Sequence, residues 1–127
     1  MRDRPNGAEL LWQAREVLLR ELLEQLPDSK RYDGLMIASA MAIAAREIEA
    51  GDAPLRRWSQ SLAELYGEVG PPKGSGAALE EDTLRLETRL VQEIRGGARD
   101  GDAHIHALLE EMTRDKLRES NPKALRA

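Results

Sequence analysis

The sequence contains no cysteine and no phenylalanine, and aromatic residues make up only 3% of its 127 residues. The lack of cysteine excludes disulfide bonds, thiolate metal sites and cysteine nucleophiles. A core without phenylalanine must be built from leucine, isoleucine, valine, methionine and alanine. Such a core favours helices over sheets, because strands are enriched in aromatic and β-branched residues. We therefore expect an all-α fold.

Long apolar runs are also missing from the sequence. Residues 35–45 carry no charge, but these eleven residues are too few for a membrane-spanning helix, which needs about 20. The N-terminal stretch MRDRPNGAEL has no apolar segment of signal-peptide length before its charges resume. We therefore expect a cytoplasmic protein with no membrane partner.

An excess of positive charge is absent as well. The chain has 19 basic and 23 acidic residues and a net charge of -4. Nucleic-acid-binding proteins usually carry a basic excess, because the release of counterions from phosphates supplies much of their affinity, so we expect no nucleic-acid partner. A chain with 41% hydrophobic and 33% charged residues is globular in composition. Its length suits one domain, and we predict a single helical domain over residues 1–127.

What the sequence does contain is a series of amphipathic helical segments separated by turn signals. Five helices are predicted: residues 7–26 with Asn6 as N-cap, residues 31–50, a third that Asp52 caps, residues 78–95, and a fifth that Asp100 or Asp102 caps. The stretch GEVGPPKGSG, residues 67–76, cannot continue a helix, because it holds four glycines and two prolines. We therefore predict a bundle of five main helices with this loop between the third and the fourth.

The second predicted helix, residues 31–50, contains most of the stretch MIASAMAIAAREIEAG, residues 36–51, and is apolar almost all round. On a helical wheel its larger residues share one broad face with two alanines: Met36, Ile37, Ala40, Met41, Ile43, Ala44 and Ile48. The other face is small, with Ala38, Ser39, Ala42 and Ala45. A helix of this kind is normally buried, so we expect the large face in the core and a close neighbour on the small face. In the alternative, the small face meets a second copy of the chain in a homodimer.

A carboxylate, Glu47, falls on the large face of this helix, one turn from its end. A charged side chain in a core is costly unless it is paired. One hypothesis is a structural ion pair with an arginine or lysine of another helix. The other hypothesis is a ligand-binding pocket in which Glu47 lies with Arg46 and Tyr32 and has a raised pKa, as functional carboxylates often do.

Two short motifs carry the residue types of metal and phosphate sites. In DGDAHIH, residues 100–106, the side chains of His104 and His106 diverge on a helix and cannot bind the same ion. The glycine-rich loop contains Lys73, Gly74 and Ser75, but their order and helical surroundings differ from those of a phosphate-binding loop. We therefore predict no metal and no cofactor, and we assign no catalytic residue.

Four stretches together resemble a bacterial helical domain family of unknown function, over nearly the whole chain. They are RPNGAELLWQAREVLLRELLEQLP, YDGLMIASAMAIAAREIEAG, LVQEIRGG with the following DGD, and DKLRESNPKAL. The most specific parts are the helix end AARE-x-E-x-G and the terminal KL-x-x-x-NP. Members of the family tend to be encoded beside acyl-CoA dehydrogenases and aminoglycoside-phosphotransferase-like kinases, which implies a role near acyl-CoA metabolism. The family has no established catalytic residues, so the resemblance carries none over.

These observations favour an accessory or protein-interaction module with a protein partner, linked by the resemblance to acyl-CoA metabolism. The alternative is a small-ligand-binding protein or enzyme with a pocket near Arg46 and Glu47. A deep pocket with converging polar groups would favour the alternative, whereas a packed interior with an exposed apolar patch would favour the interaction module.

Overall fold

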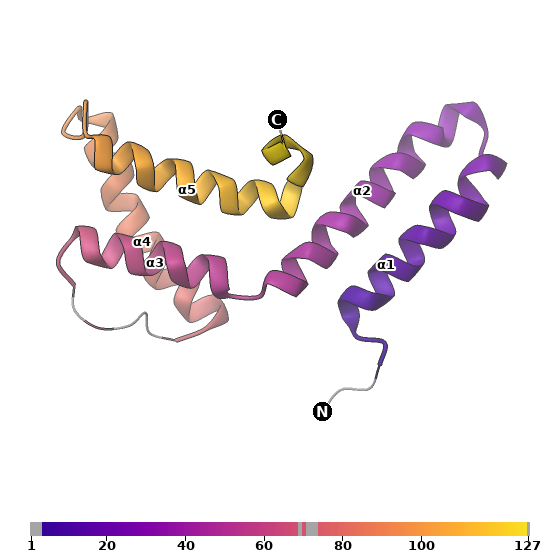
Figure 1. The fold of residues 1–127 in the computed structure, drawn as a ribbon, viewed down its shortest axis with the longest axis horizontal. Helices are drawn as coiled ribbons and strands as arrows, with labels where there is room; N and C mark the ends of the chain where they lie inside the picture. The colour runs from indigo at the N-terminus through magenta and orange to yellow at the C-terminus, as the bar shows by residue number, and fades with distance from the viewer. Residues whose placement is uncertain (1–3, 69, 71–73, 127) are drawn as a thin grey trace. The chain divides into compact units, whose positions relative to one another are not determined.

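The computed structural model describes residues 4–68, 70 and 74–126. It confirms the all-α prediction, because the described residues form helices and no strand. Five α-helices follow one another along the chain (Figure 1): α1 (Gly7–Val17), α2 (Asp28–Ala50), α3 (Ala53–Leu65), α4 (Gly76–Arg95) and α5 (Ala103–Ser120). None of the helices in this part of the chain combines the length and the apolar character that crossing a bilayer requires.

The chain divides into two compact units. The hairpin unit comprises Met1–Gly51 and Leu117–Ala127, and the three-helix unit comprises Asp52–Lys116. The hairpin unit contains α1, α2 and the last turn of α5, and the three-helix unit contains α3, α4 and the rest of α5. That residues 1–127 form one domain stays a prediction.

In the hairpin unit the first helix begins where the sequence predicts. The Asn6 side chain accepts a hydrogen bond from the backbone N–H of Glu9 at 2.9 Å, which satisfies one of the free donors at the helix start. After Val17 the chain continues as a π-helical turn, Leu18–Leu22, and a 3-10 turn, Leu23–Gln25. Pro27 then precedes α2, which starts three residues earlier than predicted.

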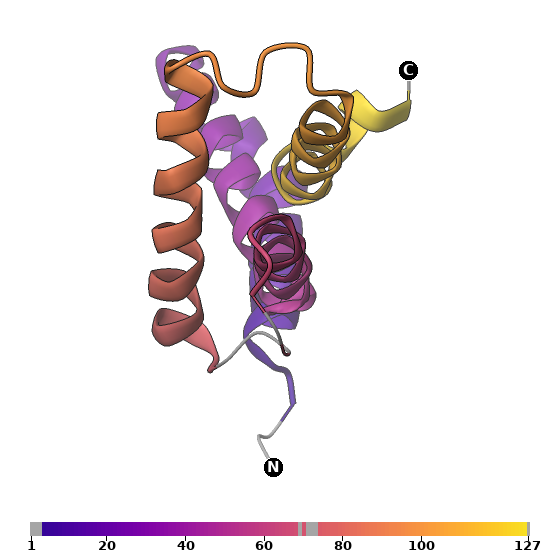
Figure 2. The same ribbon diagram turned by 90° about the vertical axis from the view of Figure 1, so that its left-hand side faces the viewer.

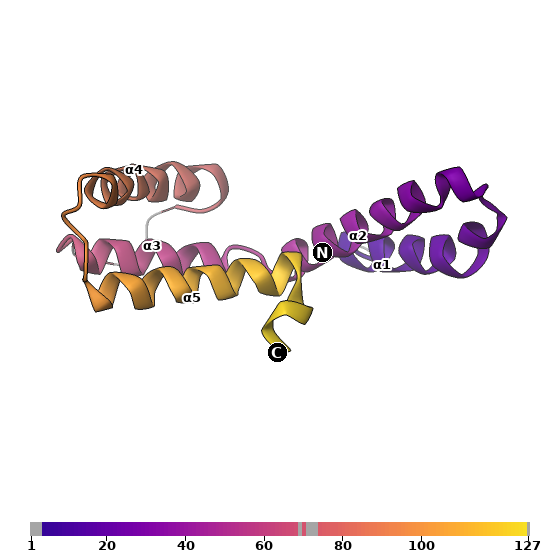
Figure 3. The ribbon, with the colours of Figure 1, turned by 90° about the horizontal axis from the view of Figure 1, so that it is seen from above.

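The two long helices of the hairpin unit, α1 and α2, run side by side in opposite directions (Figure 3). Packing within this unit buries small residues of α2: Gly34 against Leu23 and Leu26 of the turn before it, and Ala38, Ala42 and Ala45 further along the helix. Among the described residues of this unit, Leu23 is the only buried side chain larger than alanine. A Cβ at Gly34 would lie 2.9 Å from a methyl group of Leu26 and 3.0 Å from one of Leu23, so the absence of a side chain there allows the close approach.

The expectation that the large face of α2 lies in the core is wrong. Met36 is 51% exposed, Ile37 is 50% exposed, and Ile48 is exposed as well. The small face packs against α1 instead, so the neighbour expected there belongs to the same chain. Periodicity could not decide between two apolar faces; the narrow spacing of the hairpin selects the small one, because only small residues let two backbones approach closely.

The three-helix unit has a conventional apolar core. It contains Trp58 and Leu62 of α3, Leu86 and Leu90 of α4, and Ile105 of α5. Figure 2 shows α4 running across α3 and α5, which are both seen nearly end-on. Helices that cross in this way hold one shared cluster of side chains between them.

Two aspartates fix the helix starts of this unit. Asp102 caps α5, because its Oδ1 accepts from the backbone N–H groups of His104 and Ile105 at 3.0 and 3.2 Å. Asp52 precedes α3 as predicted, but its carboxylate accepts instead from the backbone N–H of Gly76 at the start of α4, at 3.1 Å. Of the predicted loop 67–76, residues 69 and 71–73 lie outside the described residues.

Candidate functional site

The three residues predicted to bind a ligand all lie on α2. Tyr32 is 70% exposed, Glu47 is exposed, and Arg46 is half-buried. The rise of an α-helix places Tyr32 roughly 20 Å from Arg46, so the structure does not bring these two side chains into one small pocket. The expectation that Glu47 lies in the core is wrong, because the large face of α2 is exposed. The ligand-binding role of the three residues stays a prediction.

Arg46 takes part in a cluster around Trp12, which we call the Trp12 cluster. The guanidinium carbons of Arg46 and Arg15 lie 5.7 and 5.9 Å from the centre of the Trp12 ring, within the range of cation–π attraction. The Trp12 indole N–H donates to the Glu49 carboxylate. Arg46 also donates to the backbone carbonyl of Glu119 at 3.2 Å. The cluster therefore ties α1, α2 and the last turn of α5 together within the hairpin unit.

Sequence reasoning missed this cluster, although it marked AARE-x-E as specific. Of the three charged residues of that motif, Arg46 and Glu49 contact Trp12, and Glu47 does not take part in these contacts. One signal in the sequence could have indicated the cluster. The first helix has a single tryptophan, and the next helix has an arginine and a glutamate three residues apart, which can contact the ring face and the indole N–H. The polar groups of the cluster form hydrogen bonds with one another and with the backbone. We therefore interpret the cluster as a structural contact that stabilises the hairpin unit.

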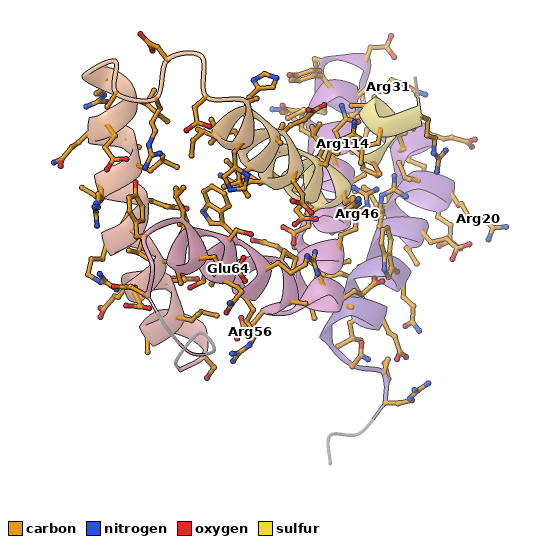
Figure 4. All side chains as sticks on the ribbon, turned by 60° about the vertical axis from the view of Figure 1, so that its left-hand side comes forward. Arg20, Arg31, Arg46, Arg56, Glu64 and Arg114 are labelled. Carbon is orange, nitrogen blue, oxygen red and sulfur yellow. The ribbon has the colours of Figure 1, made fainter. Side chains whose placement is uncertain are left out.

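The three-helix unit carries a groove between α3 and α5, which we call the α3–α5 groove. Its volume is about 450 Å³, within the range of small-molecule sites. The apolar part of its lining comes from Trp58, Leu108 and Met112. The polar part comes from Arg56, Arg57, Gln60, Ser61, Glu64, Glu111 and Asp115. Figure 4 shows Arg56 and Glu64 extending from α3.

The cationic groups of the α3–α5 groove are already engaged. Arg57 pairs with the Asp115 carboxylate at 3.1 Å, and Arg56 donates to the backbone carbonyl of Gly74 at 2.7 Å. Of the remaining carboxylates, Glu64 accepts from the Gln60 amide at 3.0 Å. Within the described part of the chain, neither Glu64 nor Glu111 pairs with a cation. The groove thus presents two open negative charges beside an apolar surface.

A third feature, the Tyr66 network, joins the ends of α3 and α4 to the loop before α5. The Tyr66 hydroxyl donates to Glu93 at 2.8 Å, and Arg99 donates to the same carboxylate oxygen at 2.9 Å. The Arg89 guanidinium lies 4.0 Å from the centre of the Tyr66 ring. The hydrogen bond from Tyr66, followed by the effects of Arg99, holds the pKa of Glu93 below its usual value.

The same network also affects the tyrosine and the capping aspartate. Burial, followed by the hydrogen bond to Glu93, raises the pKa of the Tyr66 hydroxyl. The backbone N–H of Ile105, followed by Arg99, holds the pKa of Asp102 below its usual value. The polar groups of the network have hydrogen-bond partners within the fold. The network therefore stabilises the turn between α4 and α5.

Lowering the pH should weaken the Tyr66 network. A carboxyl group whose pKa is depressed in the folded state adds stability above its ordinary pKa of 4.5, and this stability is lost as the pH falls through the folded value. We expect Glu93→Gln to be less stable than the parent at pH 7, and the difference to shrink as the pH falls below about 4.5. Urea titrations of both proteins between pH 7 and pH 3 measure this difference, and a constant difference would contradict the assigned role.

The two histidines of DGDAHIH lie near the start of α5, with the His106 side chain lining a second cavity of about 460 Å³ beside the Tyr66 network. No group of three or more histidine, aspartate or glutamate side chains that could hold a metal occurs in residues 4–68, 70 and 74–126.

The outer surface of α2 carries exposed large apolar side chains. Five large apolar residues of this helix are exposed to between 44% and 70%: Tyr32, Leu35, Met36, Ile37 and Ile48. Residues 35–45, which form its middle, carry no charge. Large apolar side chains exposed along one helix are typical of sites where proteins meet.

The helical hairpin and the three-helix unit define a small all-α protein. Residues 24–124 match the model of a family described as "Domain of unknown function (DUF6285)". The chain belongs to this family, so its resemblance to a domain family of unknown function is confirmed. Helix α1 lies before the matched residues. No curated protein and no solved structure matches the chain.

Proposed function

We propose that this chain is an accessory protein-interaction module that pairs with a second copy of itself through the outer surface of α2. One observation carries the proposal: α2 exposes its large apolar residues while its small residues form the contact with α1. On α2, the fully buried residues are thus glycine and alanine, whereas Leu35, Met36 and Ile37 are exposed.

This arrangement leaves large apolar side chains of α2 exposed to water. Burying a large aliphatic side chain that is otherwise exposed to water stabilises the folded or associated state by about 1.5–3 kcal/mol. In the hairpin unit, Leu23 is the only large side chain among the described residues that is fully buried, and its other large apolar side chains are half-buried or exposed. Pairing the outer surface of α2 with another apolar surface would supply the missing burial.

The absence of charge in residues 35–45 favours an apolar partner surface, such as that of a second copy, over a charged one. The chain has a net charge of -4, so two copies repel each other over much of their surfaces. The uncharged residues 35–45 form a segment within which the copies face no like charges, and Glu47 lies just beyond it on the same helix. A twofold axis brings the same patch of each copy together, so apolar side chains would face apolar side chains.

The working context of the module follows from the family resemblance. That resemblance implies a bacterial protein close to acyl-CoA metabolism, and we include an acyl-CoA enzyme or a kinase-like protein as the partner of the dimer. The cytoplasmic location is proposed separately, from the short apolar run and the charged N-terminal stretch of the sequence. The alternative of a ligand pocket near Arg46 and Glu47 has less support, because the Arg46 guanidinium is engaged by Trp12 and by the carbonyl of Glu119.

Light scattering coupled to size exclusion tests the dimer. We expect the parent to have twice the 14.2 kDa mass of one chain, and Met36→Glu to have the mass of one chain, because it places a carboxylate in the apolar contact. The matched control is Leu84→Glu, since Leu84 of α4 is also exposed, at 59%, but belongs to the other unit.

Three outcomes would overturn the proposed dimer through α2. A parent that stays monomeric at high micromolar concentration would exclude the second copy and direct the search to a different protein. A Met36→Glu variant that stays dimeric, or a Leu84→Glu variant that dissociates equally, would show that the copies meet through another surface.

A further inference from the structure

We propose that the α3–α5 groove binds a basic amphipathic helix of a protein partner, with its apolar side chains over Met112 and Leu108 and its cationic side chains beside Glu64 and Glu111. This inference goes beyond the dimer proposed above. It does not depend on that dimer, because every residue involved belongs to the three-helix unit.

The groove exists because one position on α3 is small. Arg57, Ser61 and Glu64 recur at the helical spacing of three or four residues and face α5. On α5 the facing positions are Leu108, Met112 and Asp115, at the same spacing. Ser61 lies in the middle of its row, so its short side chain leaves the centre of the groove open where a larger residue would fill it.

The length and chemistry of the groove suit a helix. From Arg57 to Glu64 it follows roughly 10 Å of α3, which is about two helical turns. Apolar side chains of a bound helix at positions i, i+4 and i+7 would span this distance, because seven residues rise by about 10 Å. Docking the apolar face of an amphipathic helix into such a groove is a common mode of peptide recognition.

The pattern of free and engaged charges selects a cationic partner. Arg57 and Asp115 satisfy each other, and Arg56 is held by the carbonyl of Gly74. The Glu64 carboxylate meets only a neutral amide, and Glu111 meets no cation among the residues that the structure describes. A bound lysine or arginine would complement both carboxylates, whereas an acidic helix would be repelled by them.

The test uses the full chain and a defined probe. The probe is a fluorescein-labelled helical peptide of 14 residues. Leucines on one face of the peptide cover about two helical turns, and lysines occupy the opposite face. Its partner probe has glutamate in place of lysine. Fluorescence anisotropy measures the dissociation constant for the parent and for three variants.

We expect the lysine peptide to bind the parent and the glutamate peptide not to bind. The double variant Glu64→Gln, Glu111→Gln should bind the lysine peptide about fivefold or more weakly, since two partly exposed ion pairs are lost. Ser61→Leu should weaken binding without any change of charge, because it fills the groove. The matched control Glu80→Gln, Glu81→Gln, on the exposed surface of α4, removes the same charge and should change binding less than twofold.

Several results would overturn the proposal. These are failure of the lysine peptide to bind the parent, equal binding of the glutamate peptide, an equal loss in the α4 control, or unchanged binding by Ser61→Leu. Light scattering on the same samples shows whether the dimer persists, so failure of the groove and failure of the dimer are seen separately. Circular dichroism of each variant verifies that it is folded, and the charge variants alter only exposed side chains.

Discussion

Leu62→Ala should lower the free energy of unfolding by about 2–5 kcal/mol, the usual cost of removing a large aliphatic side chain from a core. Leu62 is 0% exposed and lies in the cluster that joins α3 to α4 and α5. The cavity left by the substitution would be surrounded by Trp58, Leu86 and Leu90. Urea titration followed by circular dichroism measures the change.

The control for this prediction is Leu84→Ala, because Leu84 is a largely exposed leucine on α4. Its effect should stay within about 0.5 kcal/mol. Equal losses for the two variants would show that Leu62 does not hold the three-helix unit together. The same titration tests whether residues 1–127 form one domain, since a single domain should unfold in one transition.

Ala42→Leu should destabilise the hairpin unit by about 1–3 kcal/mol, the usual cost of forcing extra methylenes into a packed contact. Ala42 is 2% exposed and lies where α2 approaches α1. The added side chain would push the two helices apart and strain the hydrogen bond from Arg15 to the carbonyl of Ala38, which is 3.1 Å long. Thermal unfolding followed by circular dichroism measures the loss.

The matched control is Ala40→Leu, because Ala40 lies on the same helix and is exposed. Leucine and alanine have similar helix propensities, so the stability of Ala40→Leu should stay close to that of the parent when both also carry Met36→Glu, which removes the dimer proposed through this surface. If Ala40→Leu were the more damaging of the two, the assignment of the buried and exposed faces of α2 would be reversed.

The course of the chain could be predicted from sequence because it depends on local signals. Asn6, Pro27, Gly51 and Asp102 mark helix ends through capping, fixed φ or positive φ, and the structure has helix boundaries at or beside each of them. These effects act within a few residues, so a single sequence contains what is needed to locate them.

The orientation of α2 could not be predicted in the same way. Its two faces are both apolar. Which face packs inside the hairpin unit depends on how closely the neighbouring segment approaches, and this distance depends on Gly34 and Ala38 together with residues of that segment. The Trp12 cluster and the α3–α5 groove were missed for a related reason. Each depends on side chains of separate helices, and the groove depends on the small size of Ser61 opposite Met112.

The hydrogen bond from Arg46 to the carbonyl of Glu119 joins residues 73 positions apart, which has a consequence for biosynthesis. Residues 52–116 must all be translated before the chain returns to the hairpin unit at Leu117. At about 5–20 residues per second, this takes roughly 3–13 s. During that interval α1 and α2 exist on the ribosome without the segment that completes their unit, while the exposed apolar residues of α2 are available to chaperones or to a neighbouring nascent chain.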